Sequence, residues 1–131
     1  MKEEEKTKGI ILVIDDHPFF ATNMKYKLAK HGYKVFAAEN GIQGIIRAKH
    51  VHPDIILIDY IMPAMDGIET CKKIRSEEDL KDCDLIIYTS EAYSNIVSQA
   101  VQAGAKDFIT KTAPFEKIVE KLDNLMAKRK K

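Results

Sequence analysis

The chain has 131 residues, of which 45% are hydrophobic and 31% charged, and its formal net charge at pH 7 is +1. This size suits one domain with its own hydrophobic core. The nearly balanced charge gives no reason to expect binding to nucleic acid or to a membrane surface. The two cysteines, Cys71 and Cys83, do not form a CxxC motif, and no set of Cys and His residues has the spacing of a zinc site.

The N-terminal sequence MKEEEKTKG is charged and lacks the apolar core of a signal peptide. No apolar run in the sequence approaches the length needed to span a membrane. We therefore expect a cytoplasmic protein whose thiols are reduced. We expect residues 1–8 to form an N-terminal tail, residues 9–127 a single domain, and residues 128–131 a basic C-terminal tail.

Five apolar segments typical of strands alternate with five amphipathic segments typical of helices. In chain order, the predicted elements are a strand at 10–15, a helix at 16–32, a strand at 33–38, a helix at 39–51, a strand at 54–59, a helix at 65–78, a strand at 84–89, a helix at 91–104, a strand at 107–110 and a helix at 114–128. The strands are nearly continuously apolar, which is typical of a parallel sheet. The sequence therefore predicts an α/β fold, a doubly wound five-stranded parallel sheet with helices on both faces.

Helical periodicity predicts which side chains face the core. In the helix at 39–51, Asn40 is the expected N-cap, and Ile42, Ile45 and Ile46 are expected to face inward. The expected buried side of the helix at 91–104 consists of Ile96, Val97, Ala100 and Val101. The expected buried stripe of the last helix consists of Phe115, Ile118, Val119, Leu122 and Met126.

Carboxylates follow two strands that should be neighbours. Asp15 and Asp16 come at the end of the first strand, and Asp59 ends the third. Functional sites in such sheets lie beyond the carboxyl ends of the strands. Two unit charges about 4 Å apart repel by roughly 4 kcal/mol at an effective dielectric constant near 20. A hard divalent cation such as Mg²⁺ would relieve this repulsion.

The fourth and fifth strands end in donor groups. Thr89 supplies a hydroxyl, and Lys111 supplies an ammonium. Both are suited to contact phosphoryl oxygens. A carboxylate nucleophile, a metal ion, a lysine and a hydroxyl together favour phosphoryl transfer. Taken singly, an Asp after a strand is usually a turn residue and a Lys there is usually solvated, so the joint placement carries the interpretation.

The segments VIDDHP, IILIDYIMPAMDG, IIYTS and AGAKDFITK resemble, in order and spacing, the receiver domain of two-component response regulators. The resemblance covers roughly residues 9–127 and is closest to single-domain receivers of the chemotaxis-regulator type. It implies a flavodoxin-like fold with the strand order 2-1-3-4-5 and five helices. It also implies a signalling domain rather than an enzyme, with self-dephosphorylation as its intrinsic reaction.

The resemblance implies roles for individual residues. Asp59 would accept a phosphoryl group from a sensor histidine kinase or a histidine phosphotransfer protein. Asp15, Asp16 and Asp59, with the backbone carbonyl of Ile61, would hold Mg²⁺. Lys111 would pair with the phosphoryl group.

The same family pattern implies a switch and an output surface. Thr89 would move toward the phosphoryl group, and Phe108 would turn inward when it does. The downstream protein target would bind the surface formed by residues 91–126. We expect no binding of nucleic acid or membrane by this chain, and a monomer or a phosphorylation-dependent dimer.

Three positions depart from the family pattern or vary within it. Thr112 follows Lys111 where the family has a proline after a cis bond. A cis bond before a residue other than proline costs about 3 kcal/mol, which favours a trans bond here. Ile61 and Glu91, each two residues beyond a site residue, stand where the family tunes the lifetime of the phosphoryl group.

Alternative functions remain open at this point. One is the receiver part of a longer DNA-binding regulator, since DDHP is common among such receivers. Another is an aspartyl-phosphate phosphatase of the haloacid dehalogenase type, although that class has a DxDx[TV] motif where this chain has DDHPF. A flavin or nucleotide binder is disfavoured by the lack of a phosphate-binding loop after the first strand.

Three histidines receive simple interpretations. His17 either caps the first helix or borders the site, and we favour the cap. His50 and His52 are expected in a solvated turn before the third strand, because no third metal ligand stands near them in the sequence.

Overall fold

The computed structural model describes residues 7–90 and 94–129. Its five strands are β1 Gly9–Ile14, β2 Tyr33–Ala38, β3 Ile55–Ile58, β4 Asp84–Thr89 and β5 Ala105–Thr110. They form one sheet in the order β2-β1-β3-β4-β5, and every neighbouring pair is parallel. The predicted fold class and strand order are confirmed.

The five predicted helices are α1 Pro18–Lys30, α2 Gly41–Val51, α3 Gly67–Ser76, α4 Ser94–Gln102 and α5 Phe115–Arg129. A short 3₁₀ helix, η2 Glu78–Leu80, was not predicted. Helix α1 begins at Pro18 and not at Asp16, because proline suits the first helical position and restricts the residue before it to an extended backbone. Asp16 therefore lies in a loop beside the sheet.

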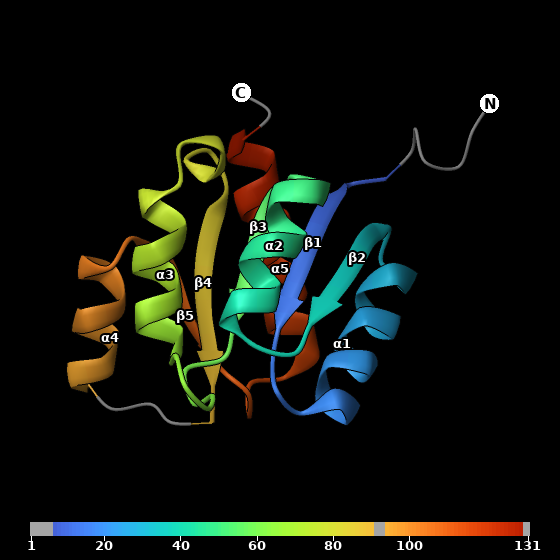
Figure 1. The fold of residues 1–131 in the computed structure, drawn as a ribbon. Coiled ribbons are helices and arrows are strands. Elements are labelled where there is room, and N and C mark those ends of the chain that lie inside the picture. The colour runs from blue at the N-terminus through green and yellow to red at the C-terminus, as the bar shows by residue number, and fades with distance from the viewer. Residues whose placement is uncertain (1–6, 91–93, 130–131) are drawn as a thin grey trace.

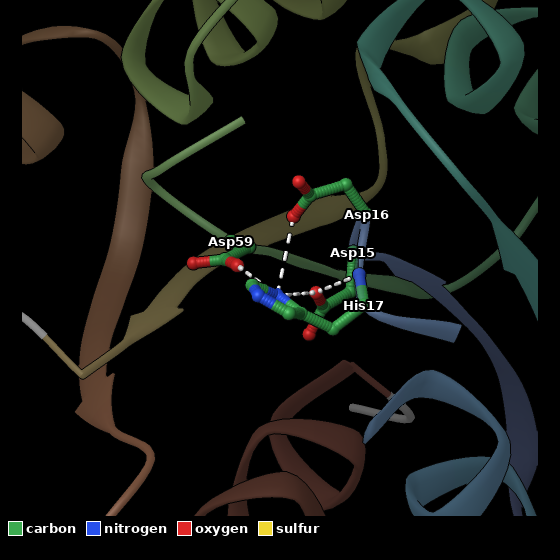
Figure 2. Close-up of side chains that lie close together, drawn as sticks. All are labelled: Asp15, Asp16, His17 and Asp59. Carbon is green, nitrogen blue, oxygen red and sulfur yellow. Dashed lines mark hydrogen bonds and ion pairs between the residues drawn. The ribbon is translucent and has the colours of Figure 1, made fainter. Parts of the chain in front are cut away.

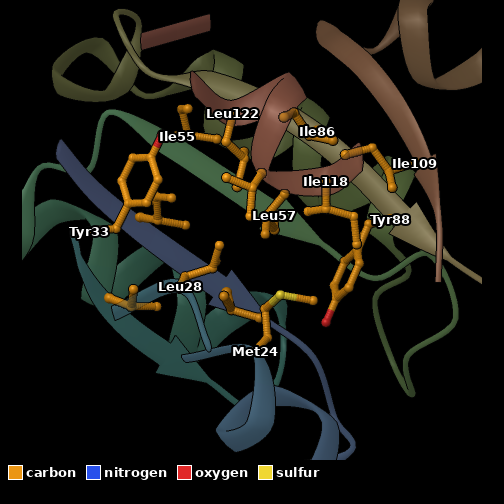
Figure 3. Packing of buried hydrophobic residues seen from close by; sticks show 14 of the residues in the cluster. Met24, Leu28, Tyr33, Ile55, Leu57, Ile86, Tyr88, Ile109, Ile118 and Leu122 are labelled. Carbon is orange, nitrogen blue, oxygen red and sulfur yellow. The ribbon is translucent and has the colours of Figure 1, made fainter. Parts of the chain in front are cut away.

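The helices cover both faces of the sheet, because alternate strand residues point to opposite sides. Ile11 and Val13 of β1 pack in a core with α1 and α5, whereas Leu12 and Ile14 pack in a second core with α2, α3 and α4. Figure 3 shows part of the first core, around Leu57. In Figure 1 the strand arrowheads point away from the chain termini, so the carboxyl edge of the sheet is opposite to both ends.

The predicted inward face of α2 is wrong for two of its three isoleucines. Ile42 and Ile46 are 60% and 50% exposed. The buried residues of α2 are instead Gly41, Gly44 and Ala48. A Cβ at Gly44 would collide with the side chain of Ile14, so the helix approaches the sheet through its small residues. The sequence periodicity correctly predicted a helix. The side of the helix that faces the sheet is the one with glycines, because small residues allow close packing.

The predicted buried side of α4 is also wrong for two of its four residues. Ile96 and Ala100 are buried, as predicted, but Val97 and Val101 are 37% and 61% exposed. Residues four apart form one stripe on a helix, and only the stripe of Ile96 and Ala100 faces the sheet. In α5 the predicted stripe is confirmed, with Phe115 partly buried and the other four residues buried.

The segment after β3 is held close to the sheet. Asp66 caps α3 by accepting a hydrogen bond from the Glu69 amide at 2.8 Å, and Glu69 completes a capping box. The Gly67 amide donates to the Tyr60 carbonyl at 2.8 Å. A Cβ at Gly67 would lie 2.5 Å from the backbone oxygen of Asp59, so only glycine allows this approach.

Helix α5 continues to Arg129, two residues beyond the expected limit of the domain. Arg129 Nη1 donates to the Asp82 carbonyl at 2.7 Å and pairs with Asp84 Oδ2 at 3.3 Å. Among the helices within residues 7–90 and 94–129, none has both the length and the apolar character needed to cross a membrane.

Candidate functional site

Two buried carboxylates lie at the carboxyl ends of two paired central strands. Asp15 follows β1 and Asp59 follows β3, and they are 1% and 2% exposed. Asp16 and His17 come directly after Asp15, and one ligand atom from each of the four residues lies within 4.8 Å of the others. Figure 2 shows these side chains gathered at one point. The structure therefore brings together all three carboxylates that the sequence placed at the strand ends.

Lys111, which follows β5, reaches into this acidic group. Its Nζ donates hydrogen bonds to Asp15 Oδ2 at 2.8 Å and to Asp59 Oδ2 at 3.1 Å. The ammonium lies 4.2 Å from the ring centroid of Phe20 and 5.1 Å from that of Tyr88. Ring faces of this kind attract a cation. The lysine is therefore fixed between two carboxylates and two aromatic rings.

The two carboxylates have opposite pKa shifts. Burial raises the pKa of both, because it disfavours the charged form. At Asp15, donors from Lys111, the His17 backbone and Tyr88 outweigh burial, and the pKa falls below its usual value. At Asp59, burial and the charge of Asp15 prevail over Lys111 and Thr89, and the pKa is raised. Of these two carboxylates, Asp59 is therefore the one whose charged form is disfavoured, and an added cation would favour that form.

Tyr88 is a site residue that the sequence reasoning missed. Its hydroxyl, buried in β4, donates to Asp15 Oδ2 at 3.1 Å. Burial, and then the charge of Asp15, raise the pKa of Tyr88 far above its usual value, so the phenol keeps its proton and acts as a donor. The signal was present in the sequence. A tyrosine in an otherwise aliphatic buried strand needs a partner for its hydroxyl.

Thr89 and Phe108 lie on β4 and β5, the two strands that follow β3 in the order of the sheet. Thr89 ends β4, is 1% exposed, and makes a side-chain hydrogen bond that lowers the pKa of Asp59. Its carbonyl accepts a hydrogen bond from the Lys111 amide at 2.9 Å. Phe108 pairs with Ile87 in the sheet and is partly buried against the core under α2, α3 and α4. Thr89 thus contacts the carboxylate of Asp59, whereas Phe108 packs against the hydrophobic core.

The donor set fits a divalent cation. Asp16 Oδ1 is buried and makes no hydrogen bond. Buried polar atoms normally have a hydrogen-bond partner. This oxygen has none, lies near the Asp15 and Asp59 carboxylates and 3.3 Å from His17 Nδ1, and is suited to bind a cation. The carbonyl of Ile61 was expected as a further ligand. The backbone of Ile61 lies next to the site, because its amide donates a hydrogen bond to Asp59 Oδ1 at 3.4 Å.

The interpretation of His17 as a helix cap is wrong. His17 occupies the N-cap position of α1, but its side chain makes no capping hydrogen bond. Its Nδ1 lies 3.3 Å from both Asp15 Oδ1 and Asp16 Oδ1. The nearby carboxylates attract the imidazole more strongly than a backbone amide does. His17 therefore borders the site, which was the alternative that the sequence analysis left open.

The loop after β5 has the expected trans geometry. No cis peptide bond occurs in the part of the chain that the structure describes, so the Lys111–Thr112 bond is trans. Glu91, expected to tune the phosphoryl lifetime, lies outside the described residues. His50 and His52 are both exposed, as predicted. His52 is the C-cap of α2, but the placement of His50 in a turn is wrong, because His50 lies in the last turn of that helix.

Known proteins share this arrangement of sequence. The chain matches the profile of the response regulator receiver domain over residues 11–123. It is 35% identical over 117 residues to the chemotaxis protein CheY of Bacillus subtilis, and the match covers 88% of this chain and 96% of that protein. Among solved structures, the signal receiver domain of a signal transduction histidine kinase from Syntrophus aciditrophicus is 29% identical. It has a TM-score of 0.82 and covers 91% of this chain and 90% of that one.

Some relatives are much longer than this chain. The match to hybrid signal transduction histidine kinase D of Dictyostelium discoideum is 31% identical and covers 98% of this chain, but only 8% of that protein. The match to the alkaline phosphatase synthesis transcriptional regulatory protein PhoP of Bacillus subtilis is 32% identical and covers 80% of this chain and 42% of the regulator. The same unit therefore occurs alone and within larger proteins.

Proposed function

The chain belongs to the family of response regulator receiver domains, and from this we propose that Asp59 accepts a phosphoryl group from a phosphohistidine of a partner protein. The donor would be a sensor histidine kinase or a histidine phosphotransfer protein. Asp15 is equally buried and also contacts Lys111, so the resemblance of the segment IILIDYIMPAMDG to the family pattern is what selects Asp59 of the two. The geometry of Asp59 supports this choice. Its buried carboxylate lies at the end of a central strand, 3.1 Å from the Lys111 ammonium and within the acidic group.

In the proposed step, a carboxylate oxygen of Asp59 forms a bond to phosphorus while the bond from phosphorus to the histidine nitrogen breaks. The imidazole leaves with the electron pair of that bond. Asp59 is held by a rigid strand end, which favours a fixed line of attack. Burial raises the pKa of Asp59, and nearby positive charge counteracts this shift and favours the ionised nucleophile.

Lys111 and Thr89 supply donors for the transferred group. The Lys111 ammonium, 9% exposed, offers its charge to a phosphoryl oxygen once Asp59 is phosphorylated. The Thr89 hydroxyl offers a neutral hydrogen bond from the neighbouring strand. Asp15, Asp16 and Asp59, with the Ile61 carbonyl, would hold Mg²⁺, which supplies positive charge opposite the phosphoryl oxygens.

The proposed output is a change in partner binding. Thr89 and Phe108 would bias two states of the surface within residues 91–126. The exposed Val97 and Val101 of α4 give this surface apolar contact area. The free thiols of Cys71 and Cys83 are consistent with a reducing cytoplasm. A receiver unit inside a longer DNA-binding regulator is the second candidate, and the match to PhoP favours it.

Intact-protein mass spectrometry after incubation with acetyl phosphate tests the proposal. Wild type is expected to gain one phosphoryl group only when Mg²⁺ is present. Asp59→Asn should gain none, whereas the control Asp79→Asn, which changes an exposed carboxylate in η2, should be labelled like wild type. A wild-type protein that stays unlabelled while a known receiver is labelled under the same conditions contradicts the proposal.

A further inference from the structure

The His17 imidazole lies at the mouth of the acidic group and contacts all three carboxylates. Its Nδ1 is 3.3 Å from Asp15 Oδ1, 3.3 Å from Asp16 Oδ1 and 3.9 Å from Asp59 Oδ2. In Figure 2 the dashed lines to the three carboxylates meet at this nitrogen. The side chain is 65% exposed, so it closes the group on its solvent side while its inner edge faces the oxygens.

These distances suit ligands of one metal ion. In a tetrahedral zinc site with bonds of about 2.0–2.1 Å, two ligand atoms are separated by about 3.3 Å. In an octahedral magnesium site with similar bonds, adjacent ligand atoms are about 2.9 Å apart. The two distances of 3.3 Å from Nδ1 are near the wider spacing, whereas the distance of 3.9 Å to Asp59 Oδ2 is longer than either. The contact with Asp15 Oδ1 is also within hydrogen-bond distance. The oxygen Asp16 Oδ1, which makes no hydrogen bond, is one of the atoms involved.

The backbone fixes where this imidazole starts. Pro18 occupies the beginning of α1, and His17 has the extended backbone, φ −96° and ψ 100°, that a residue before proline prefers. The His17 amide donates to Asp15 Oδ1 at 2.9 Å. The ring is therefore attached at a fixed point beside the carboxylates, and its side chain has no helix-capping bond to lose.

We propose that His17 is a metal ligand in this chain, and that its nitrogen makes the site prefer zinc-class divalent ions over Mg²⁺. This inference rests on the proposed function only in placing a cation among Asp15, Asp16 and Asp59. Three carboxylates alone form an all-oxygen site, which suits magnesium. An added imidazole suits Zn²⁺, Co²⁺ and Ni²⁺, which bind nitrogen readily, whereas Mg²⁺ gains little from it.

Calorimetric titration with Co²⁺ and with Mg²⁺ distinguishes a site that includes the His17 nitrogen from a site made of oxygen ligands alone. For His17→Ala, we expect the Kd for Co²⁺ to rise by about tenfold or more, the loss typical of a disturbed metal centre. The Kd for Mg²⁺ is expected to change by less than about threefold, because its ligands are oxygens. His50→Ala is the matched control, since it removes an exposed histidine outside the site, and both constants should stay at the wild-type values.

The visible absorption of bound Co²⁺ gives a second readout, independent of affinity. Its bands in wild type should weaken and shift in His17→Ala and in His17→Gln, and remain in His50→Ala. The inference is overturned if Co²⁺ affinity and spectrum do not depend on His17, or if Mg²⁺ and Co²⁺ lose affinity equally. The two proposals can fail separately. If Asp59 is phosphorylated in a Mg²⁺-dependent reaction while the Kd and the spectrum of Co²⁺ are the same in wild type and His17→Ala, this inference fails and the proposed function stands.

Discussion

The hydroxyl of Tyr88 donates a hydrogen bond to Asp15 Oδ2 at 3.1 Å, and the same oxygen accepts a bond from Lys111 Nζ at 2.8 Å. Tyr88 and Asp15 come from strands β4 and β1, which are separated in the sheet by β3. The tyrosine thus links the strand that ends in Thr89 to the acidic group. Its ring also contacts Phe20 edge-on, with centroids 5.7 Å apart.

Replacing Tyr88 with Phe removes the hydroxyl and keeps the ring. We expect the free energy of unfolding at pH 7 to fall by about 1.5 kcal/mol, the lower range for a hydrogen bond to a charged group. Urea denaturation measures this change. Tyr26→Phe is the control, because Tyr26 is 62% exposed on α1 and its loss should change stability by less than about 0.5 kcal/mol.

The Tyr88→Phe effect should depend on pH. The folded pKa of Asp15 is lowered, so its ionised form stabilises the fold above the unfolded pKa of about 3.9, and this stability is lost as the pH falls through the folded pKa. Without the phenol, that pKa lies nearer its ordinary value. The difference between wild type and variant should therefore be largest above about pH 5 and shrink below about pH 4. A difference that does not change with pH would show that the bond does not depend on the Asp15 charge.

Asp59→Asn is expected to stabilise the protein in metal-free buffer. Because the folded pKa of Asp59 is raised, its ionised form destabilises the fold, and the cost grows as the pH rises from about 3.9 through the folded pKa. Asn keeps the shape and removes the charge. We expect the free energy of unfolding at pH 7 to increase by on the order of 1 kcal/mol, with little gain near pH 4.

Magnesium should make wild type more stable than Asp59→Asn, the reverse of the order expected in metal-free buffer. A ligand that binds only the folded state stabilises it by about 2.7 kcal/mol at one hundred times its Kd. The thermal midpoint of wild type should rise with MgCl₂, and that of Asp59→Asn should rise less because it lacks one charged ligand. Equal shifts in both proteins would argue against Asp59 as a ligand.

Lys111→Met should be among the more destabilising changes at this edge of the sheet. Removing one partner of a buried ion pair typically costs about 3–5 kcal/mol, because the other charge stays buried and unpaired. Here both Asp15 and Asp59 lose their bond to the ammonium. In the Asp59→Asn background the loss should be smaller, since one of the two charges is gone. A double-mutant cycle from urea denaturation measures this coupling, and strictly additive effects would contradict it.

Helix α2 offers a test of the core assignment. Gly44→Ala should destabilise the protein by about 1–3 kcal/mol, because the new Cβ forces the fully buried Ile14 to move. Ile46→Ser, on the exposed side of the same helix, should change stability by about 0.5 kcal/mol or less. Thermal or urea unfolding of the two variants would contradict the assignment if their order were reversed.

The fold and the main site follow from the amino-acid sequence. Nearly continuous apolar strands alternating with amphipathic helices are typical of a parallel sheet with two covered faces, because such strands have to bury both of their sides. The carboxyl ends of parallel strands lie at one edge, so the convergence of Asp15, Asp16 and Asp59 followed from their positions in the chain. Asn40 marked the start of α2, because its side chain accepts a hydrogen bond from a free amide.

The orientation of α2 and the partners of Tyr88 and His17 depend on which surfaces pack together, and they are known only from the folded chain. Periodicity gives α2 an apolar side, but the fit of Gly44 against Ile14 turned Ile42 and Ile46 outward. Tyr88 finds its acceptor on a strand 73 residues earlier, and His17 turns from its helix toward three carboxylates. Close packing and through-space charge act between residues far apart in the sequence, so local patterns do not show which residues become partners.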